Sequence, residues 1–185
     1  STAVRRSAPF VCSRSPGDDR GSGGVSSGKA AVVTVSDRVS AGTAEDHSGP
    51  AAIALLESID IEVIDYRVIP DGIESVAGAL TEIAGGVDLI LTTGGTGLTP
   101  RDLTPEGTRA VLEREAPGLA EAMRAATFGE NPHGMLSRGV AGTVGSTLVV
   151  NLPGSVRGVE ESLSVILPAL GHGIELLVHG SSDHN

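Results

Sequence analysis

Lysine is almost absent from this sequence of 185 residues, and its scarcity excludes two classes of site. Lys29 is the only lysine, and it lies just before the first apolar run. A Walker-type phosphate loop needs a lysine after its glycines, and a Schiff-base enzyme needs one in its pocket, so neither can lie beyond residue 29. The eight cations after that position are arginines, whose planar guanidinium suits bidentate contacts with phosphate or carboxylate oxygens. Four of them lie in or beside loops that we interpret as functional: Arg38, Arg101, Arg138 and Arg157.

Aromatic residues are equally scarce, with Phe10, Tyr66 and Phe128 as the full set. The formal net charge is -10, and residues 1–29 hold five of the 13 cations but two of the 23 acidic residues, so the rest of the chain is strongly acidic. Contacts with nucleic-acid phosphates need a basic face, and base stacking needs aromatic side chains. We therefore expect no nucleic acid as a partner.

The single cysteine, Cys12, rules out a disulfide framework and a cysteine-based metal site, which agrees with the cytoplasmic location that we expect. Residues 1–28 are rich in Ser, Gly and Arg without an apolar period, and we predict a disordered leader there. The pair Arg5-Arg6 is followed by no apolar region of signal-peptide length, so neither export nor a membrane partner is expected. The predicted organisation is one domain at 29–180 and a flexible C-terminus at 181–185.

From residue 30 the chain alternates strand and helix patterns. The continuous apolar run "AAVVTVS" is typical of a strand covered on both faces, and residues 73–84 have an apolar stripe of helical spacing. Ser48 and Thr104 are expected to cap helices. We predict strands at 30–36, 61–69 and 87–93, two strand pieces within 139–151, and helices at 48–58, 73–84, 105–115, 117–126, 156–167 and 168–180.

This alternation predicts an α/β fold with three layers, in which helices cover both faces of a mostly parallel sheet. Ligands of such sheets bind outside the carboxyl ends of the strands. The loops expected to meet there are 36–38, 70–72, 94–97 and 151–155.

The segment "LTTGGTGLTPRDLTPEGT", residues 91–108, is the most informative of these regions. Gly94, Gly95 and Gly97 predict an anion cradle, although a sharp glycine turn also occurs for purely structural reasons. Asp102 would repel an anion there unless a cation intervened. Mg²⁺ is such a cation, and it prefers one or two carboxylates together with substrate phosphates.

Other polar residues at this edge have both a structural and a functional interpretation. Asp71 is either a site carboxylate or a cap of the helix at 73–84, and Asp37 and Glu106 could serve as loop and helix-dipole carboxylates. Ser137 is either a hydroxyl donor to a ligand phosphate or a simple loop serine. The five histidines share no metal-ligand spacing, so we assign them no role.

Six segments together carry a resemblance to a known family: "TVSD", "VIPD", "LTTGGTGLTPRDLTPEGT", "PGLAEAMR", "MLSRGVAGTVGSTLVVNLPG" and "LPAL". With them the chain resembles the MogA/MoaB family of molybdenum cofactor biosynthesis proteins, and it is similar to the G domains of fusion proteins such as gephyrin. The resemblance covers about residues 30 to 178. After "NLPG" it departs from many relatives, because Ser155-Val156 stands where they have a residue followed by proline.

The resemblance implies the molybdopterin-binding fold of this family and a molybdopterin adenylyltransferase, in which the pterin phosphate attacks the α-phosphate of ATP with help from Mg²⁺. It further implies a homotrimer and a molybdenum insertase as a partner. Asp71 and Asp102 match the two essential aspartates and would hold the metal. Expected contacts to nucleotide or pterin are Ser36, Asp37, Gly94, Gly95, Thr96, Gly97, Arg101, Glu106, Ser137, Arg138, Asn151, Pro153 and Gly154.

Two alternative functions stay open at this point. A MoaB-type protein would share these motifs and bind molybdopterin without catalysis. A dinucleotide-dependent oxidoreductase is disfavoured, because its glycines should read GxGxxG after the first strand instead of GGTG after the third.

Overall fold

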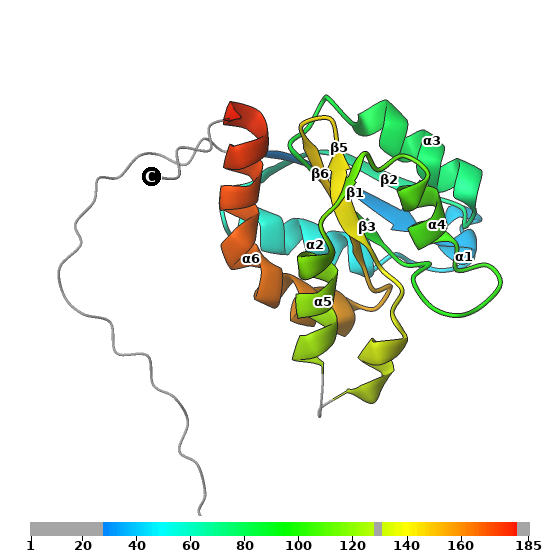
Figure 1. Ribbon diagram of the computed structural model, residues 1–185. Helices are drawn as coiled ribbons and strands as arrows, with labels where there is room; N and C mark the ends of the chain where they lie inside the picture. Colours follow the sequence, from blue (N-terminus) through cyan, green and yellow to red (C-terminus); the bar gives the residue numbers. More distant parts are fainter. Residues whose placement is uncertain (1–27, 128–130, 181–185) are drawn as a thin grey trace, which may run out of the picture.

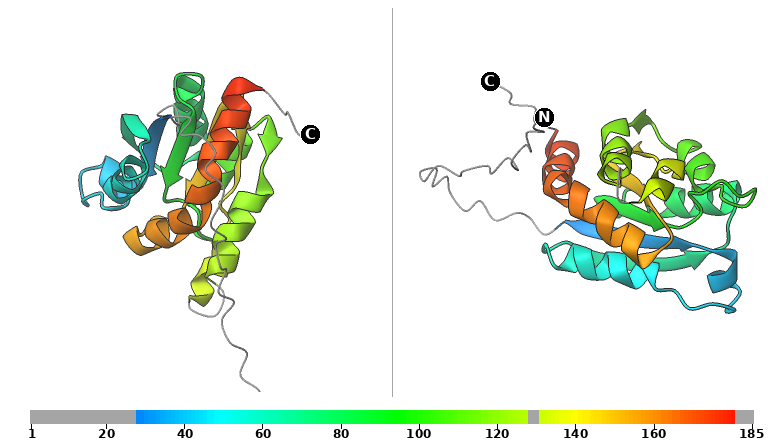
Figure 2. Two further views of the ribbon diagram at one scale, coloured as in Figure 1. Left: turned by 90° about the vertical axis from the view of Figure 1, so that its left-hand side faces the viewer. Right: turned by 90° about the horizontal axis from the view of Figure 1, so that it is seen from below.

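The computed structural model describes residues 28–127 and 131–180. The predicted leader, apart from Gly28, and the predicted flexible C-terminus lie outside these residues. The described chain forms a central sheet with helices on both faces (Figures 1 and 2), which confirms the predicted three-layer α/β architecture.

The sheet has six strands in the order β2-β1-β3-β6-β5-β4. Four strands form the parallel part of the sheet, in which each strand pairs in parallel with the next. In order, they are β2 (Glu62–Ile69), β1 (Lys29–Val35), β3 (Leu89–Thr93) and β6 (Thr147–Leu152). The last two strands, β5 (Ala141–Val144) and β4 (Arg114–Glu115), each run antiparallel to their neighbour. The carboxyl ends of four strands therefore meet along one edge of the sheet, as the strand pattern predicts.

Two apolar cores hold the layers together, one on each face of the sheet. Alternate residues of β1 enter opposite cores, with Val32 in the first and Val33 in the second. Both side chains are buried, which explains the continuous apolar run in the sequence. The first core lies under α2 (Ser48–Glu57), α5 (Pro117–Ala126) and α6 (Val156–His179), and the second lies under α3 (Ile73–Ile83).

Helix α4 (Thr104–Arg109) is shorter than the predicted helix 105–115, which is wrong in its second half. The next residues approach β5, where Glu113 N donates to Thr143 O at 2.8 Å and Ala116 N donates to Ala141 O at 2.8 Å. These bonds make β4 the outermost strand of the sheet. Long-range pairing therefore overrides the local helix preference.

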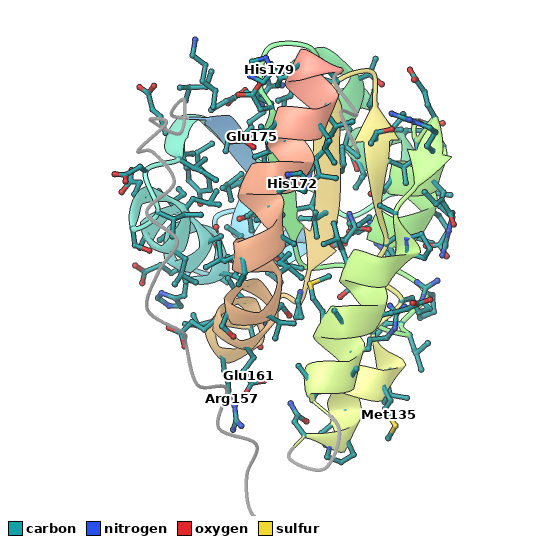
Figure 3. All side chains as sticks on the ribbon, turned by 60° about the vertical axis from the view of Figure 1, so that its left-hand side comes forward. Met135, Arg157, Glu161, His172, Glu175 and His179 are labelled. Carbon is teal, nitrogen blue, oxygen red and sulfur yellow. The ribbon has the colours of Figure 1, made fainter. Side chains whose placement is uncertain are left out.

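Helix α6 is continuous, whereas the sequence predicts two helices divided before Pro168. Pro168 is exposed, so the carbonyl left without a helical partner can be hydrated by solvent. By length and composition α6 could span a membrane, but its stripe of buried residues packs into the first core. Its outer face carries His172, Glu175 and His179 (Figure 3).

Candidate functional site

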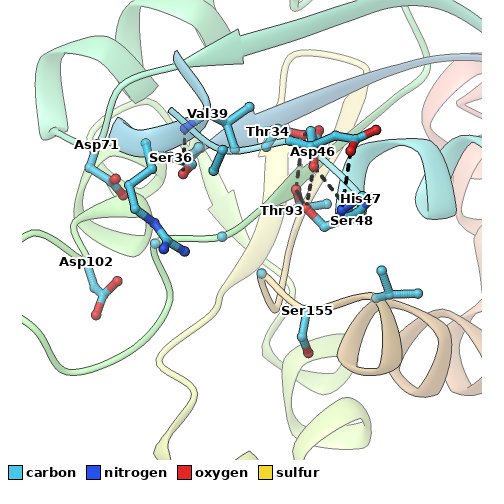
Figure 4. A pocket seen from close by; sticks show the side chains of 18 residues that line it. Thr34, Ser36, Val39, Asp46, His47, Ser48, Asp71, Thr93, Asp102 and Ser155 are labelled. Carbon is cyan, nitrogen blue, oxygen red and sulfur yellow. Dashed lines mark hydrogen bonds and ion pairs between the residues drawn. The ribbon is translucent and has the colours of Figure 1, made fainter. Parts of the chain in front are cut away.

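A cavity of about 420 Å³ opens at the carboxyl edge of the parallel strands. Figure 4 shows Asp71 and Asp102 on one side of it, and Thr34, Asp46, Ser48 and Thr93 on the other. The structure thus brings together the loops that follow four different strands, β1, β2, β3 and β6. Of the predicted site residues, those that line this cavity are Ser36, Asp71, Gly94, Gly95, Asp102 and Gly154.

The glycine turn after β3 is shaped by close backbone packing. Gly94 and Gly95 have φ angles of 90° and 62°, and a Cβ on Gly94 would lie 2.4 Å from the carbonyl oxygen of Val35. The N–H of Gly94 donates to Leu152 O at 3.2 Å, so this donor holds the turn to β6. The structural and functional interpretations of the glycines are therefore compatible, since the turn is both tightly packed and part of the cavity wall.

Asp37 and Asp71 hold each other across the ends of β1 and β2. Asp37 N donates to Asp71 Oδ2 at 2.8 Å, and Asp71 N donates to Asp37 Oδ1 at 3.1 Å. Arg101 adds two bonds of 2.9 Å to the Asp37 carboxylate, and this arginine holds the pKa of Asp37 below its usual value of 3.8. Asp71 therefore accepts from the first residue of the short helix α1 (Asp37–Ser40) and does not cap α3, whose first turn donates no hydrogen bond to a side-chain cap.

Asp102 projects from a long loop, residues 94–103, that is anchored from behind by Arg138. Thr99 N donates to Asp102 Oδ2 at 2.8 Å, and a Cβ on Gly97 would lie 2.8 Å from the same oxygen. Arg138 donates from Nε to Gly97 O at 2.8 Å and from Nη2 to Asp102 O, while Nη1 contacts the Glu106 carboxylate. The predicted contacts Arg138 and Glu106 thus support the loop and do not line the cavity.

The Arg138–Glu106 ion pair is partly buried, and it lowers the pKa of Glu106. Burial acts to raise the pKa of Glu106, but the hydrogen bond from Arg138 outweighs it, so the pKa lies below the usual 4.5. Glu106 is therefore a carboxylate at neutral pH, and its ion pair with Arg138 holds α4 to the 94–103 loop.

The remaining predicted residues lie away from the main cavity. Ser137 borders a separate cavity of about 350 Å³, together with Arg109, Arg124 and Arg138. Asn151 is buried, and its amide group donates to the hydroxyls of Thr92 and Thr108 at 2.9 Å each. Asn151 thus ties β6 to β3 and α4. Pro153 borders a small pocket beside Ser137, and Thr96 is buried in the loop.

Sequence reasoning missed Asp46, which organises the other side of the main cavity. Its carboxylate accepts from the backbone N–H groups of Ser48 and Gly49 at 3.0 and 3.1 Å, so Asp46 caps α2 in place of the predicted Ser48. It also accepts from Thr34 Oγ1 and from the hydroxyl of Tyr66, at 2.5 Å each. An acidic residue just before "HSGP" is a helix-start signal that could have identified it.

These contacts shift two pKa values in opposite directions. Burial acts to raise the pKa of Asp46, but the donors from Thr34, Tyr66 and Gly49 outweigh it and lower the pKa below 3.8. Burial and the adjacent Asp46 carboxylate raise the pKa of Tyr66 to about 12. The Asp46 carboxylate is therefore ionised, and Tyr66 is a neutral hydroxyl donor, at neutral pH.

The hydroxyls next to Asp46 complete a polar cavity floor. Ser48 Oγ lies 2.9 Å from Thr93 Oγ1, which donates to Thr34 Oγ1 at 3.3 Å. These three side chains come from α2, β3 and β1 and are all buried. Their mutual bonds fix the floor before any ligand enters.

The carboxylates of Asp71 and Asp102 fit a divalent cation bound jointly with substrate phosphates. One oxygen of each, Oδ1, accepts no hydrogen bond from the described residues. Within residues 28–127 and 131–180, no group of three His, Cys, Asp or Glu side chains could enclose a metal. The pair of carboxylates, Asp71 and Asp102, suits Mg²⁺, because this ion takes one or two protein carboxylates and completes its coordination from phosphates and water.

Comparisons with known proteins agree with this geometry. The probable molybdopterin binding domain family matches residues 31–172. Molybdopterin adenylyltransferase of Helicobacter pylori J99 is 34% identical over 80% of this chain and 86% of its own length. Dictyostelium discoideum gephyrin is 45% identical over 79% of this chain, which spans 22% of gephyrin.

A solved structure carries the same resemblance. The molybdopterin biosynthesis enzyme MoaB of Thermus thermophilus has a TM-score of 0.77 and 44% identity, with 82% of this chain and 97% of that chain covered. The family match spans most of the described residues, and the H. pylori relative is covered nearly end to end. The chain therefore belongs to the MogA/MoaB family of molybdenum cofactor biosynthesis proteins, which the motifs of its sequence resemble.

Proposed function

We propose that this protein is a molybdopterin adenylyltransferase that uses ATP and Mg²⁺. The terminal phosphate of molybdopterin attacks the α-phosphorus of ATP, the bond to the β-phosphate breaks, and adenylylated molybdopterin and pyrophosphate form. The observation that carries the proposal is the meeting of Asp71 and Asp102 in one cavity, beside the Gly94–Gly95 turn. Relatives with the same domain are named for this activity.

The residues of the cavity suit a reaction that proceeds by positioning and charge neutralisation. Asp71 and Asp102 would hold Mg²⁺, which when bound neutralises charge on the nucleotide phosphates. Gly154 and Ser155 place the amino end of α6 at the cavity, where the helix dipole favours an anionic group. The hydroxyl floor of Thr34, Ser48 and Thr93 offers neutral hydrogen-bonding groups to a polar ring or ribose.

The cavity offers no covalent nucleophile that an adjacent base activates. Ser48 and Thr93 are bonded to each other and to the Asp46 and Thr34 side chains, so their hydroxyls serve the network. Direct transfer between two bound substrates therefore agrees better with the site than a covalent enzyme intermediate.

We further propose a cytoplasmic homotrimer that delivers its product to a molybdenum insertase. The family resemblance supports this proposal, and sedimentation velocity tests the oligomer directly. A particle of three times the chain mass is expected, and a monomer at micromolar concentration would contradict the trimer.

The alternative function is a MoaB-type protein that binds molybdopterin without catalysis. The similarity to T. thermophilus MoaB, at 44% identity, favours this candidate. It predicts pterin binding without release of pyrophosphate.

The deciding experiment measures pyrophosphate release from purified protein with molybdopterin, ATP and Mg²⁺, with a control that lacks the pterin. We expect release that requires all three, in a one-to-one ratio with adenylylated pterin. Pterin binding without release would support the carrier function instead.

A further inference from the structure

The main cavity carries an excess of negative charge for a site that takes phosphorylated substrates. Four acidic side chains line it: Glu45, Asp46, Asp71 and Asp102. Arg38 is the only lysine or arginine among the lining residues. A substrate phosphate in this cavity has few cationic partners, and two carboxylates bound to Mg²⁺ leave the other charges uncompensated.

The guanidinium of Arg38 makes no hydrogen bond or ion pair with any residue that the structure describes. Two other arginines at this edge differ sharply in this respect. Arg101 makes three hydrogen bonds to Asp37 and Asp71, and all three guanidinium nitrogens of Arg138 bond to the 94–103 loop and to Glu106. A ligand would have to break those bonds to recruit either side chain, whereas Arg38 can bind at no such cost.

The backbone that carries Arg38 is nevertheless held firmly. The carbonyl oxygen of Arg38 accepts from the N–H and the hydroxyl of Thr43, both at 2.9 Å, and from Ala44 N at 3.2 Å. Ser36 caps α1, and the preceding residue, Asp37, is held by Asp71. A fixed backbone with an uncommitted guanidinium is an arrangement suited to ligand capture, since little ordering of the chain is needed on binding.

From these observations we propose that Arg38 binds a phosphate group of a substrate in the main cavity. The guanidinium fork matches two phosphate oxygens, so it gives direction as well as charge. This inference rests on the proposed function. The phosphate belongs either to ATP or to the monoester of molybdopterin, which share this chemistry and are separated by experiment.

The test compares Arg38→Gln, Arg38→Lys and the control Arg114→Gln in the full chain by isothermal titration calorimetry. Arg114 is also exposed and without a side-chain partner among the described residues, but it lies on β4 and does not line the cavity. The titrants are ATP with Mg²⁺, pyrophosphate with Mg²⁺, and molybdopterin alone. Thermal unfolding should be the same for all variants, because the side chain of Arg38 makes no hydrogen bond or ion pair with the described residues and its backbone bonds are kept in each variant.

We expect Arg38→Gln to weaken binding of at least one titrant by about tenfold or more, as loss of a charge-assisted hydrogen bond does. Arg38→Lys should retain part of the affinity, and Arg114→Gln should bind as the wild type does. Weaker binding of ATP and pyrophosphate assigns the phosphate to the nucleotide, and weaker binding of molybdopterin alone assigns it to the pterin.

Unchanged affinity for all three titrants in Arg38→Gln would overturn the inference while leaving the proposed function intact. If the wild type binds through Arg38 but releases no pyrophosphate with all substrates present, the inference stands and the proposed function fails. Failure of the wild type to bind any of the three would overturn both.

Discussion

Asp37 and Asp71 each donate their backbone N–H to the other's carboxylate, at 2.8 and 3.1 Å. This exchange joins the loops after β1 and β2, which are 34 residues apart in the chain. It uses one oxygen of Asp71 and leaves Oδ1 beside Gly95, where a Cβ on that glycine would lie 3.0 Å away. The carboxylate proposed to hold Mg²⁺ is therefore oriented before the metal binds.

Replacement of Asp102 by Asn should remove activity without unfolding the protein. Asn can still accept the hydrogen bond from Thr99, but it lacks the charge that attracts a cation. We expect pyrophosphate release to fall by about 100-fold or more, which is typical for the loss of one electrostatic group in an active site. The matched control is Asp60→Asn, since Asp60 has a φ of 61°, which Asn tolerates. Near-normal turnover in Asp102→Asn would exclude Asp102 from the metal site.

The Asp46–Tyr66 contact should be visible in the titration of the only tyrosine in the chain. Because the folded-state pKa is raised, this contact stabilises the fold below about pH 10, and the contribution is lost as pH rises through about 12. Tyrosinate absorbance should therefore rise with a midpoint near pH 12 in the wild type. In Asp46→Ala the midpoint should move towards 10, and an identical midpoint in both proteins would contradict the contact.

Replacement of Arg138 by Gln should destabilise the fold by about 1–3 kcal/mol, because it leaves Glu106 and two loop carbonyls without their partner. The pKa of Glu106 is lowered, so this contribution is present above about pH 4.5 and is lost as pH falls through the lower folded-state value. Urea unfolding at pH 7 measures the loss of stability in the variant, and urea unfolding at pH 3 measures how much of that loss depends on the charge of Glu106.

A matched control for this change is Arg109→Gln, which removes an exposed ion pair with Glu115 worth about 0–1 kcal/mol. Equal effects of the two substitutions would show that Arg138 does not anchor the loop. A stability difference that persists undiminished at pH 3 would show that the charge of Glu106 is not involved.

Alanine at Gly95 should disrupt the turn at the cavity. Its φ of 62° is strained for alanine, and the new Cβ would lie 2.2 Å from Thr104 Oγ1. We expect a loss of about 2 kcal/mol or more in unfolding free energy, from strain and overpacking together. Gly118→Ala in α5, where nothing lies within 4 Å of the added Cβ, should instead be stabilising by up to about 1 kcal/mol. Thermal unfolding distinguishes them, and equal midpoints would refute the packing argument.

Much of the fold follows from local patterns in the sequence. The strands at 30–36 and 87–93 are confirmed because a strand buried on both faces needs a continuous apolar run, which local composition reveals. The strand at 61–69 is confirmed as well, and it lies at the edge of the sheet with alternating exposure. The carboxyl ends of these strands define the edge where Asp71, Asp102 and the glycine turn meet, and so the place of the cavity was predictable too.

The end of α4 and the continuity of α6 could not be predicted from local sequence patterns, because they depend on contacts with distant residues or with solvent. Residues 114 and 115 join the sheet because β5 lies beside them, and α6 continues through Pro168 because the proline faces solvent. In both cases the deciding contact is with a distant segment or with water, which is visible only once the chain has folded.

The partners of the charged side chains were decided by tertiary structure alone. The sequence by itself determined that arginines would supply the positive charge near the glycine turn, but it treats Arg38, Arg101 and Arg138 alike. Folding brings Asp37 to Arg101 and Glu106 to Arg138, and it leaves Arg38 at the cavity. A charged group bonds to whatever lies within about 3 Å of it, and over such distances the spacing of residues along the chain carries almost no information.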